Sequence, residues 1–378
     1  MLPRSDAMEL TFPNYSGGGI FNLSQTIKES LDLNRRYKES SLVKFSGKPI
    51  SLVVIDGLGY DLALSAGAGK DTEMITSVFP SVTCTALTTL MSGEPPGEHA
   101  MLGDTTFVRK LGAIISNGGY KTIYCDTKDS LTRYMPIKQA YDAKNIIAEA
   151  TSNGKKCAVV CPYQWENAAL AGLTASTAGD HFFYHDIKEA FSLYNESMKR
   201  NYDFIYFYIP YVDAASHKYG PESDQTVRTA TDVLDHVTRL SNDYRKKINT
   251  VVTADHGHIK VDKWINLAPF AGRLLGNRTI PPFGSSRSLF INRAKIDDHE
   301  AKALPEGSAI FKATDGNLRR LLGSTKCMNK TMFTDIVAAA STSSFYIYPS
   351  IENGAENIVG DHGGLTSDEM TVPCIVIG

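Results

Sequence analysis

The chain has 378 residues, of which 39 are Lys or Arg and 41 are Asp or Glu, so its formal net charge is −2. This length suits one large α/β domain with an insertion, or two domains. A net charge near zero gives no reason to expect a nucleic-acid or membrane-surface partner.

The N-terminal residues 1–16 contain charged side chains and no apolar core, so they do not have the pattern of a signal peptide. No apolar run approaches the roughly 20 residues needed to span a bilayer. Six cysteines are scattered along the chain without a pattern typical of metal knuckles. Reduced thiols in a cytoplasmic protein are therefore the expectation.

Short apolar or aromatic runs alternate with helical patterns along the chain. The expected strands are Ile50–Ile55, Lys121–Cys125, Cys157–Val160, His181–Tyr184, Asp203–Ile209, Asn249–Thr253 and Val372–Ile377. The expected helices are Thr85–Met91, Ala140–Thr151, Ile187–Arg200 and Gln225–Lys246. Several strands are apolar without alternation, which is typical of strands covered on both faces. The pattern predicts an α/β fold, a doubly wound αβα sandwich with helices on both faces of its sheet.

The stretch from about Trp264 to Ser350 breaks this alternation. It contains loop signals around Pro281 and Gly284, a strand-like run Ser288–Asn292 and a helical pattern near Leu318. We interpret it as an inserted α+β subdomain. The predicted division is a catalytic core of residues 1–265 and 346–378, with the insertion at 266–345.

Polar residues of metal-binding type follow several of the expected strands, where doubly wound sheets collect ligands. Asp56 follows the first strand, and Thr83 in FPSVT lies at the start of a helix, where free amide groups favour an anion. Asp213 and His217 are four residues apart, a spacing that puts both on one face of a helical turn. Taken singly, Asp56 is also a common turn residue and Thr83 a common helix cap.

Two further segments complete the set. Asp255 and His256 lie together at a strand end, where buried polar side chains are costly without partners. His362 lies among glycines near the C-terminus, which allow close approach of the backbone. Together these residue types can supply two sites for hard or borderline metals beside one hydroxyl.

These segments resemble the alkaline phosphatase superfamily, and most closely its branch of type I phosphodiesterases and nucleotide pyrophosphatases. The run from Phe79 to Gly93 is similar to that branch's nucleophile segment, and the run from Asp213 to Pro221 is similar to its metal-binding D-x-x-x-H-x-x-G-P. Asp255-His256-Gly257 and His362-Gly363 resemble its D-H-G and C-terminal H-G. The similarity covers about residues 50–260 and resumes near 358.

The resemblance implies a fold of the alkaline phosphatase type and a metal-dependent hydrolase of phosphate esters, acting as a phosphodiesterase or nucleotide pyrophosphatase. It implies one metal held by Asp213, His217 and His362. The other metal is then held by Asp56, Asp255, His256 and the oxygen of Thr83. The metals are expected to be two divalent ions, zinc above all, with manganese or another divalent ion as alternatives. Thr83 is expected to attack phosphorus and form a phosphothreonine, which a metal-activated water then hydrolyses.

The chain departs from the family at the position of an Asn that binds a phosphoryl oxygen, because the helix from Cys84 to Met91 contains no Asn. Thr85 or a backbone N–H is the expected substitute. Within the insertion, Arg287 next to a Gly-Ser-Ser loop is a candidate contact for an anionic substrate, although a solvated Arg at a strand start is an equal alternative. His99 is interpreted as a packing residue, and His258 as a possible neighbour of a metal ligand.

Three alternatives stay open. The chain could be a phosphomonoesterase or a phosphomutase of the same superfamily, although those mutases use a Ser nucleophile. It could be a catalytically inactive binding protein that metals stabilise. A sulfatase is disfavoured, because Cys84 to Thr88 does not provide the C/S-x-P-x-R pattern. The expected partner is a small phosphate ester or nucleotide, and the sequence does not specify which one.

Overall fold

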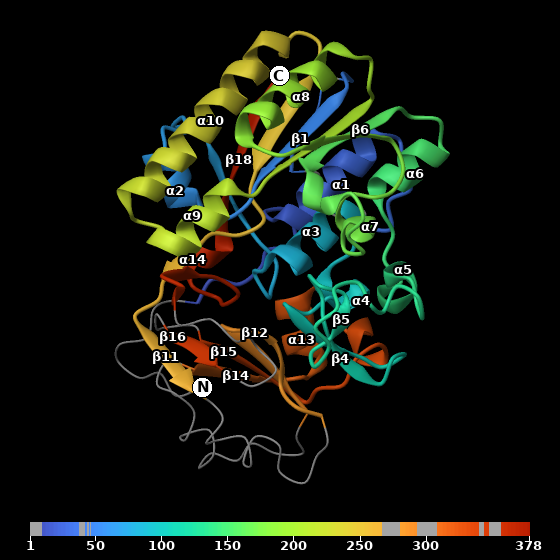
Figure 1. Cartoon of the computed structure of the whole chain (residues 1–378), viewed down its shortest axis with the longest axis vertical. Helices are drawn as coiled ribbons and strands as arrows, with labels where there is room; N and C mark the ends of the chain where they lie inside the picture. The colour runs from blue at the N-terminus through green and yellow to red at the C-terminus, as the bar shows by residue number, and fades with distance from the viewer. Residues whose placement is uncertain are drawn as a thin grey trace.

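The structure is a computed structural model, and it describes residues 10–37, 42–43, 45, 47–266, 280–292, 308–339, 344–347 and 357–378. In Figure 1 a larger upper part contains the main sheet, and a smaller lower part contains short antiparallel strands. In the described residues no helix is long and apolar enough to cross a membrane. All six cysteines are free.

The main sheet has seven strands in the order β2-β18-β9-β1-β8-β6-β7. In that order they are Glu73–Thr76, Thr371–Ile377, Asn249–Thr253, Ile50–Ile55, Phe204–Ile209, Cys157–Pro162 and Asp180–Tyr184. The five strands from β9 to β7 run parallel to one another, and β18 is antiparallel to both β2 and β9. Strand β1 lies in the middle and is fully buried, as its uniformly apolar sequence predicts.

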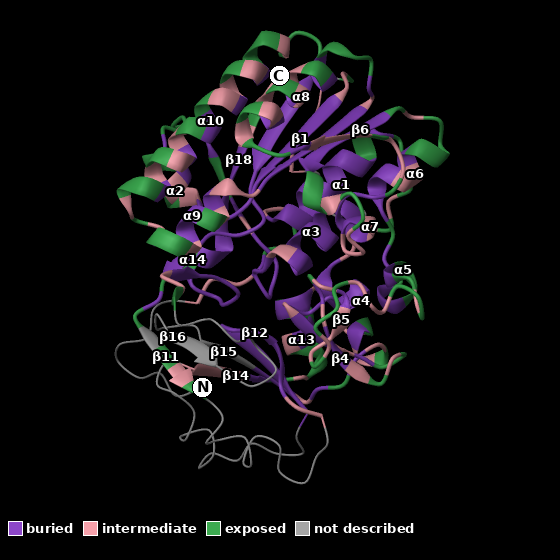
Figure 2. Cartoon of the chain, viewed as in Figure 1, coloured by how far each residue is buried: buried purple, intermediate pink, exposed green. Residues whose placement is uncertain are grey.

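Helices cover both faces of this sheet (Figure 1). One group comprises α2 (Tyr60–Ser65), α8 (Ile187–Lys199), α9 (Tyr211–Tyr219) and α10 (Asp224–Tyr244). The other comprises α1 (Ile20–Ser30), α3 (Thr83–Ser92), α6 (Ile146–Ser152) and α7 (Ala171–Thr174). Figure 2 shows buried strands between the layers, while the outer side of α10 is exposed. The predicted doubly wound α/β fold is confirmed.

The smaller part contains a four-stranded antiparallel sheet and a three-stranded sheet, packed around a second apolar core. The four-stranded sheet has the order β12-β13-β15-β14, formed by Phe283–Ser285, Ser288–Ile291, Asp335–Ala339 and Ser308–Lys312. The three-stranded sheet is β3 (Thr105–Val108), β4 (Ala113–Ser116) and β5 (Lys121–Thr122). The second core joins Leu102 and Ile114 to Phe290 and Leu318. This part is therefore built from two separate stretches of chain, and the predicted subdomain boundaries stay a prediction.

The remaining elements are short. The helices are α4 (Pro96–His99), α5 (Ile137–Tyr141), α13 (Asp315–Leu322) and α14 (Ser367–Met370), with 3-10 turns at Tyr163–Trp165 and Lys326–Asn329. Two further strand pairs join β10 (Ile259–Lys260) to β17 (Gly360–Asp361) and β11 (Lys263–Asn266) to β16 (Ser344–Ile347). The predicted strand at Ser288 and helix near Leu318 are confirmed as β13 and α13.

Two predicted elements differ from the structure. The expected strand Lys121–Cys125 is reduced to the two residues of β5, and it belongs to the three-stranded sheet instead of the main one. The expected helix Ala140–Thr151 is split into α5 and α6. Asp142 ends α5 with a left-handed φ of 52°, and the side chain of Asn145 caps α6 by accepting from the amides of Ile147 and Ala148. Helix α1 and strand β2 were not predicted from the sequence.

Candidate metal centre

Three neighbouring parallel strands bring three aspartates to one edge of the main sheet. Asp56 follows β1 and Asp255 follows β9, while Asp213 lies in the first turn of α9, just after β8. The backbone links two of these exits, since the amide of Asp56 donates to Ile209 O and the amide of Asp213 donates to Asp56 O, both at 2.9 Å. Because the three strands are adjacent and parallel, their carboxyl ends meet at one place.

Among the described residues, potential metal ligands form one group around Asp213, consisting of Asp213, His217, His258 and His362. Their ligand atoms all lie within 4.8 Å of one another. Asp213 Oδ1 is 3.3 Å from His217 Nε2, one helical turn along α9, and 3.7 Å from His362 Nε2. His362 comes from the loop that follows β17, so the group draws on residues far apart in the sequence.

A second group consists of Asp56, Asp255 and His256. His256 Nε2 lies 3.4 Å from Asp56 Oδ1 and 3.5 Å from Asp255 Oδ2. The same nitrogen is 3.1 Å from the hydroxyl oxygen of Thr83. The imidazoles of His256 and His362 stack with their centroids 3.6 Å apart, so the two groups are direct neighbours.

Three of the histidines are held by backbone carbonyls on the side away from the aspartates. His217 Nδ1 lies 2.8 Å from Gly360 O, His256 Nδ1 lies 3.1 Å from Gly257 O, and His362 Nδ1 lies 2.9 Å from Ser81 O. A carbonyl oxygen can only accept, so Nδ1 carries a hydrogen in each ring and Nε2 is the nitrogen that a neutral ring can offer to a metal. Metal-binding histidines are typically oriented by such contacts.

The aspartates present oxygens that the protein itself leaves without partners. In the part of the chain that the structure describes, Asp56 Oδ1, Asp213 Oδ1 and Asp255 Oδ2 are buried and make no hydrogen bond. A buried carboxylate oxygen without a partner is costly, and a divalent cation would remove that cost. The carboxylate and imidazole donors suit zinc and related ions, so the residues present fit a pair of divalent metals.

The charges of the site lead to the same conclusion. Burial, reinforced by the neighbouring charges of Asp255 and Asp213, raises the pKa of Asp56 well above its ordinary value. Burial and the charge of Asp213 raise the pKa of Asp255 to about 7. Three carboxylates so close together repel one another, and cations between them would favour the charged forms. Burial lowers the pKa of His256 to about 3, which leaves its ring neutral, as a metal ligand must be.

Thr83 is the first residue of α3, and its side chain is partly exposed. No side chain caps this helix end, because Val82 occupies the cap position. The amide groups of the first helical turn are therefore directed at the space beside Thr83, where they favour an anion such as a phosphate group. The structure thus brings together all seven residues that the sequence singled out as metal ligands or nucleophile.

The two predicted substrate contacts have other roles in this structure. Thr85 is fully buried, donates its hydroxyl to Met101 O and accepts from the amide of Gly103, both at 3.0 Å. Arg287 is also fully buried and forms a bidentate ion pair with Glu369, with Nε–Oε1 at 2.5 Å and Nη2–Oε2 at 3.0 Å. Both side chains hold segments of the protein together. Full burial contradicts the solvated alternative for Arg287, whereas the substrate contacts stay predictions.

At the centre, the sequence prediction missed Tyr208 and gave His258 only as a possible neighbour of a metal ligand. The hydroxyl of Tyr208 donates to Asp56 Oδ2, and the ring of Trp165 stacks on Tyr208 at a centroid distance of 4.3 Å. No sequence signal distinguishes Tyr208 from the other aromatic residues of its strand. His258 belongs to the group around Asp213, and its position just past Asp255-His256 was the available signal.

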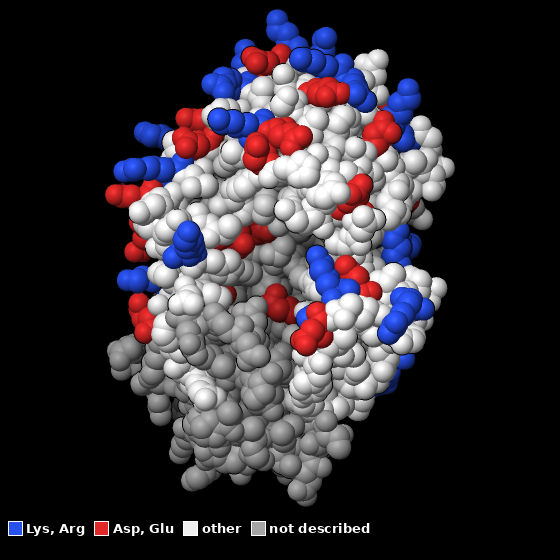
Figure 3. All heavy atoms as spheres, viewed as in Figure 1, with Lys and Arg blue, Asp and Glu red and all other residues white. Residues whose placement is uncertain are grey.

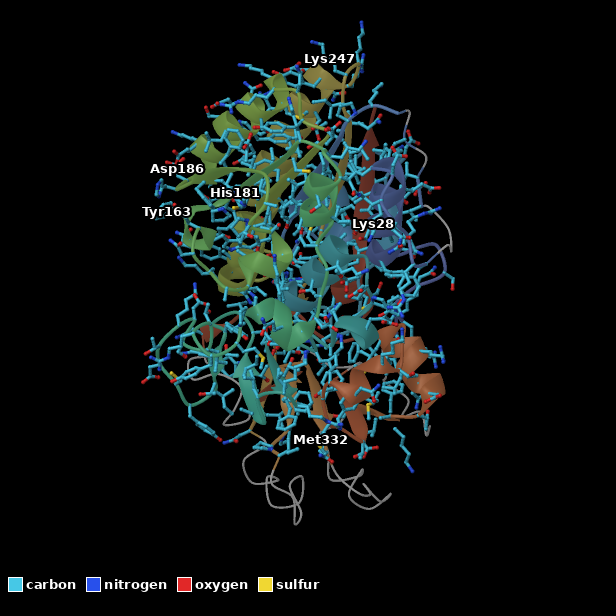
Figure 4. The ribbon with its side chains drawn as sticks, turned by 90° about the vertical axis from the view of Figure 1, so that its right-hand side faces the viewer. Lys28, Tyr163, His181, Asp186, Lys247 and Met332 are labelled. Carbon is cyan, nitrogen blue, oxygen red and sulfur yellow. The ribbon has the colours of Figure 1, made fainter. Side chains whose placement is uncertain are left out.

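Two other histidines, His99 and His181, lie outside both groups of potential metal ligands. His99 is fully buried, with Nε2 3.0 Å from the Thr89 hydroxyl and Nδ1 accepting from the amide of Met101, which supports its interpretation as a packing residue. His181 lies on edge strand β7, at one side of the molecule in Figure 4, and its ring stacks on Phe183 at a centroid distance of 5.5 Å.

The molecular surface in Figure 3 is hollowed between the larger and smaller parts, and acidic side chains lie in and beside the hollow. The two groups of potential metal ligands reach solvent to different degrees. Asp213 and His217 are 21% and 29% exposed, whereas Asp255 and His256 are fully buried. Water and substrate therefore have their most direct access at the Asp213 group.

The family model that describes the type I phosphodiesterases and nucleotide pyrophosphatases matches residues 64–364, which is well over half of the chain. No curated protein sequence matches significantly.

Several solved structures share the fold. Murine ectonucleotide pyrophosphatase/phosphodiesterase 5 is 15% identical, with a TM-score of 0.62 over 86% of this chain and 87% of that one. An inactive variant of the same murine protein in complex with AMP is 14% identical, with a TM-score of 0.61 over 86% and 87% of the two chains. Phosphonoacetate hydrolase from Sinorhizobium meliloti 1021, in complex with phosphonoacetate, is 16% identical, with a TM-score of 0.59 over 87% and 89%.

Proposed function

The chain belongs to the type I phosphodiesterase / nucleotide pyrophosphatase family, and from this premise we propose that it hydrolyses phosphodiester or pyrophosphate bonds of nucleotides at a centre of two zinc ions, with Thr83 as the nucleophile. The coarser description, a metal-dependent hydrolase of phosphate esters, follows from the family. The number and identity of the metals, the roles of single residues and the nucleotide substrate are the proposal.

One observation supports the proposal above all others. Three buried carboxylate oxygens without hydrogen-bond partners among the described residues point to the same place as four imidazoles, next to the hydroxyl at the start of α3. A protein that used these aspartates only for stability would pair each oxygen with a donor. Two divalent cations held here would lower the pKa of the Thr83 hydroxyl and offset the charge of a phosphate group.

The residues of the chain then have distinct tasks. Asp213, His217 and His362 hold one cation, and Asp56, Asp255 and His256 hold the other. Thr83 attacks phosphorus in line with the leaving group, which gives a phosphothreonine that water hydrolyses in a second step. Because Thr85 is engaged elsewhere and the helix has no Asn, the amide groups in the first turn of α3 bind the phosphoryl oxygen.

The proposal of a nucleotide substrate rests on the family's name and on the solved relative that binds AMP. We propose zinc because imidazole and carboxylate donors together suit it better than magnesium or calcium, which prefer oxygen ligands alone. The cysteines, all free, support the further proposal of a cytoplasmic protein.

A substrate panel tests the function. Metal-free protein is reconstituted with zinc or manganese and assayed on a nucleotide diester, a dinucleotide pyrophosphate, a nucleoside monophosphate and phosphonoacetate. The proposal predicts a clear preference for the first two. Preference for the monoester would favour the phosphomonoesterase alternative. No turnover of any compound by fully metallated protein would favour the inactive binding protein.

A further inference from the structure

His258 lies at the centre of the Asp213 group, although the proposed function does not use it. Its side chain is fully buried, and its Nε2 is 3.1 Å from Asp213 Oδ1. That is the shortest of the contacts that the imidazoles of His217, His258 and His362 make with this oxygen. Within the described residues neither nitrogen of His258 makes a hydrogen bond of acceptable geometry.

The backbone beside His258 leaves room for its ring. Gly57 has a left-handed φ of +75°, and a Cβ at this position would lie 2.6 Å from His258 Cε1 and 2.8 Å from the Asp213 Cα. Any side chain at position 57 would therefore displace either the ring or the start of α9. The absence of a side chain at Gly57, just after β1, therefore allows His258 and Asp213 to lie close together.

The surrounding imidazoles converge on the same space. The ring of His258 lies 4.9 Å from those of His217 and His362, at interplanar angles of 84° and 70°. One ligand atom from each of these rings and from Asp213 lies within 4.8 Å of the others, so the nitrogens share one space. Three buried or half-buried imidazoles around one carboxylate oxygen are costly as packing alone, so the arrangement calls for a ligand.

We propose that His258 is a fourth protein ligand of the metal at Asp213, which it binds through Nε2. This inference rests on the proposed function, because it assumes that a metal occupies the site. The alternative is that His258 only orients Asp213 by a hydrogen bond. That role alone would not explain why three imidazole nitrogens lie within 3.7 Å of the single oxygen Asp213 Oδ1, an arrangement that suits a shared cation.

The fourth ligand makes the two metal sites chemically different. The Asp213 site offers three imidazoles and one carboxylate, whereas the other offers one imidazole and two carboxylates with the Thr83 hydroxyl. A nitrogen-rich site favours zinc, cobalt or nickel over manganese and magnesium. Four protein ligands would leave this site fewer positions for water or a substrate oxygen than three would.

The first test measures metal binding instead of activity. Metal-free wild-type protein and the His258→Gln variant are titrated with zinc against a chromophoric chelator. Loss of an orienting residue typically weakens binding by about 10-fold to 100-fold, and loss of a ligand should exceed about 100-fold at one of the two sites. Binding at the other site should stay within a few-fold of wild type. His99→Gln is the matched control, because His99 is equally buried but lies outside both groups.

A second test uses the wild-type protein alone, so it does not depend on the folding of a variant. In the cobalt-substituted protein, paramagnetically shifted signals should come from four imidazoles: His217, His256, His258 and His362. Signals from the other three alone, or a His258→Gln variant with wild-type affinity at both sites, would overturn the inference. An active wild type with either result would leave the proposed function intact, whereas wild-type protein that binds no metal would remove both.

Discussion

At the scale of single residues, the chemistry depends on Thr83 and its immediate partners. Its hydroxyl is 3.1 Å from His256 Nε2, a nitrogen whose ring is oriented by the carbonyl of Gly257. The same nitrogen lies within 3.5 Å of the carboxylates of Asp56 and Asp255. A cation held by His256 and these two carboxylates would lower the pKa of the Thr83 hydroxyl, so that it could lose its proton and act as a nucleophile.

The first prediction concerns this hydroxyl. Thr83→Ala should lower kcat by at least about a thousandfold, on the order of 4 kcal/mol in the barrier, because no other group in this position can attack phosphorus. Metal content, measured by elemental analysis, should stay largely intact, since the aspartates and histidines remain. Thr83→Ser is the control and should retain far more activity. An alanine variant with a tenth of wild-type activity would show that another group attacks.

Residue types at strand ends made much of this site predictable. Asp56, Asp213 and Asp255 could be recognised because polar residues that directly follow buried apolar strands meet at one sheet edge. The roles of Thr85 and Arg287 could not be predicted. Their partners are Met101 and Gly103 in one case and Glu369 in the other, and such pairings depend on packing between distant segments.

At the scale of elements, the apolar strands were predictable and α1 was not. Five consecutive residues of α1, from Asn22 to Thr26, are buried, and all of them except Leu23 are polar. Ser24 donates to Leu90 O and Gln25 donates to Gly93 O, at 2.6 and 2.8 Å, so tertiary hydrogen bonds replace the apolar stripe that marks a helix in sequence. The sequence of α1 therefore lacks the periodic apolar pattern by which a helix is predicted.

The hairpin of β12 and β13 holds the loop that carries His362. Arg287 in this hairpin pairs with Glu369, and Glu369 also accepts from the amide of Gly364 at 2.8 Å. Ser286 donates to Asp361, the residue before His362, at 2.5 Å. His362, a proposed metal ligand from the C-terminal segment, is thus held in place by the smaller part of the protein.

The second prediction tests that link. Arg287→Ala should lower the free energy of unfolding by about 3 to 5 kcal/mol, because it leaves Glu369 buried without its cation. Zinc affinity should also fall at the site that contains His362. Denaturant unfolding and chelator competition measure the two effects. Arg200→Ala is the control, since Arg200 is 51% exposed and solvent screens its pair with Glu196. If Arg287→Ala behaved like Arg200→Ala, the hairpin would not hold the loop.

At the scale of the whole molecule, the metal centre joins segments that span most of the chain. Asp56 lies near the beginning of the core and His362 near its end, and both meet at one edge of the main sheet. The fold class was predictable, because strands and helices alternate in the sequence. The composition of the smaller part was not, since residues 105–122, 283–291 and 308–339 share it through contacts that have no local pattern.

The third prediction follows from this convergence. Removal of the metals with a chelator should lower the melting temperature, because the repulsion among Asp56, Asp213 and Asp255 is then unopposed. Each ion should restore about 2.7 kcal/mol of stability at a free concentration one hundred times its dissociation constant. Differential scanning fluorimetry with and without added zinc measures the shift. An unchanged melting temperature would mean that no metal binds in this place.

The most direct test of the two-step mechanism is the stereochemistry at phosphorus. A chiral phosphorothioate diester is hydrolysed by the metal-reconstituted protein in isotopically labelled water, and the configuration of the product is determined. Attack by Thr83 followed by attack of water inverts the configuration at phosphorus twice, so we predict net retention. Net inversion would show that water attacks phosphorus directly and that Thr83 forms no covalent intermediate.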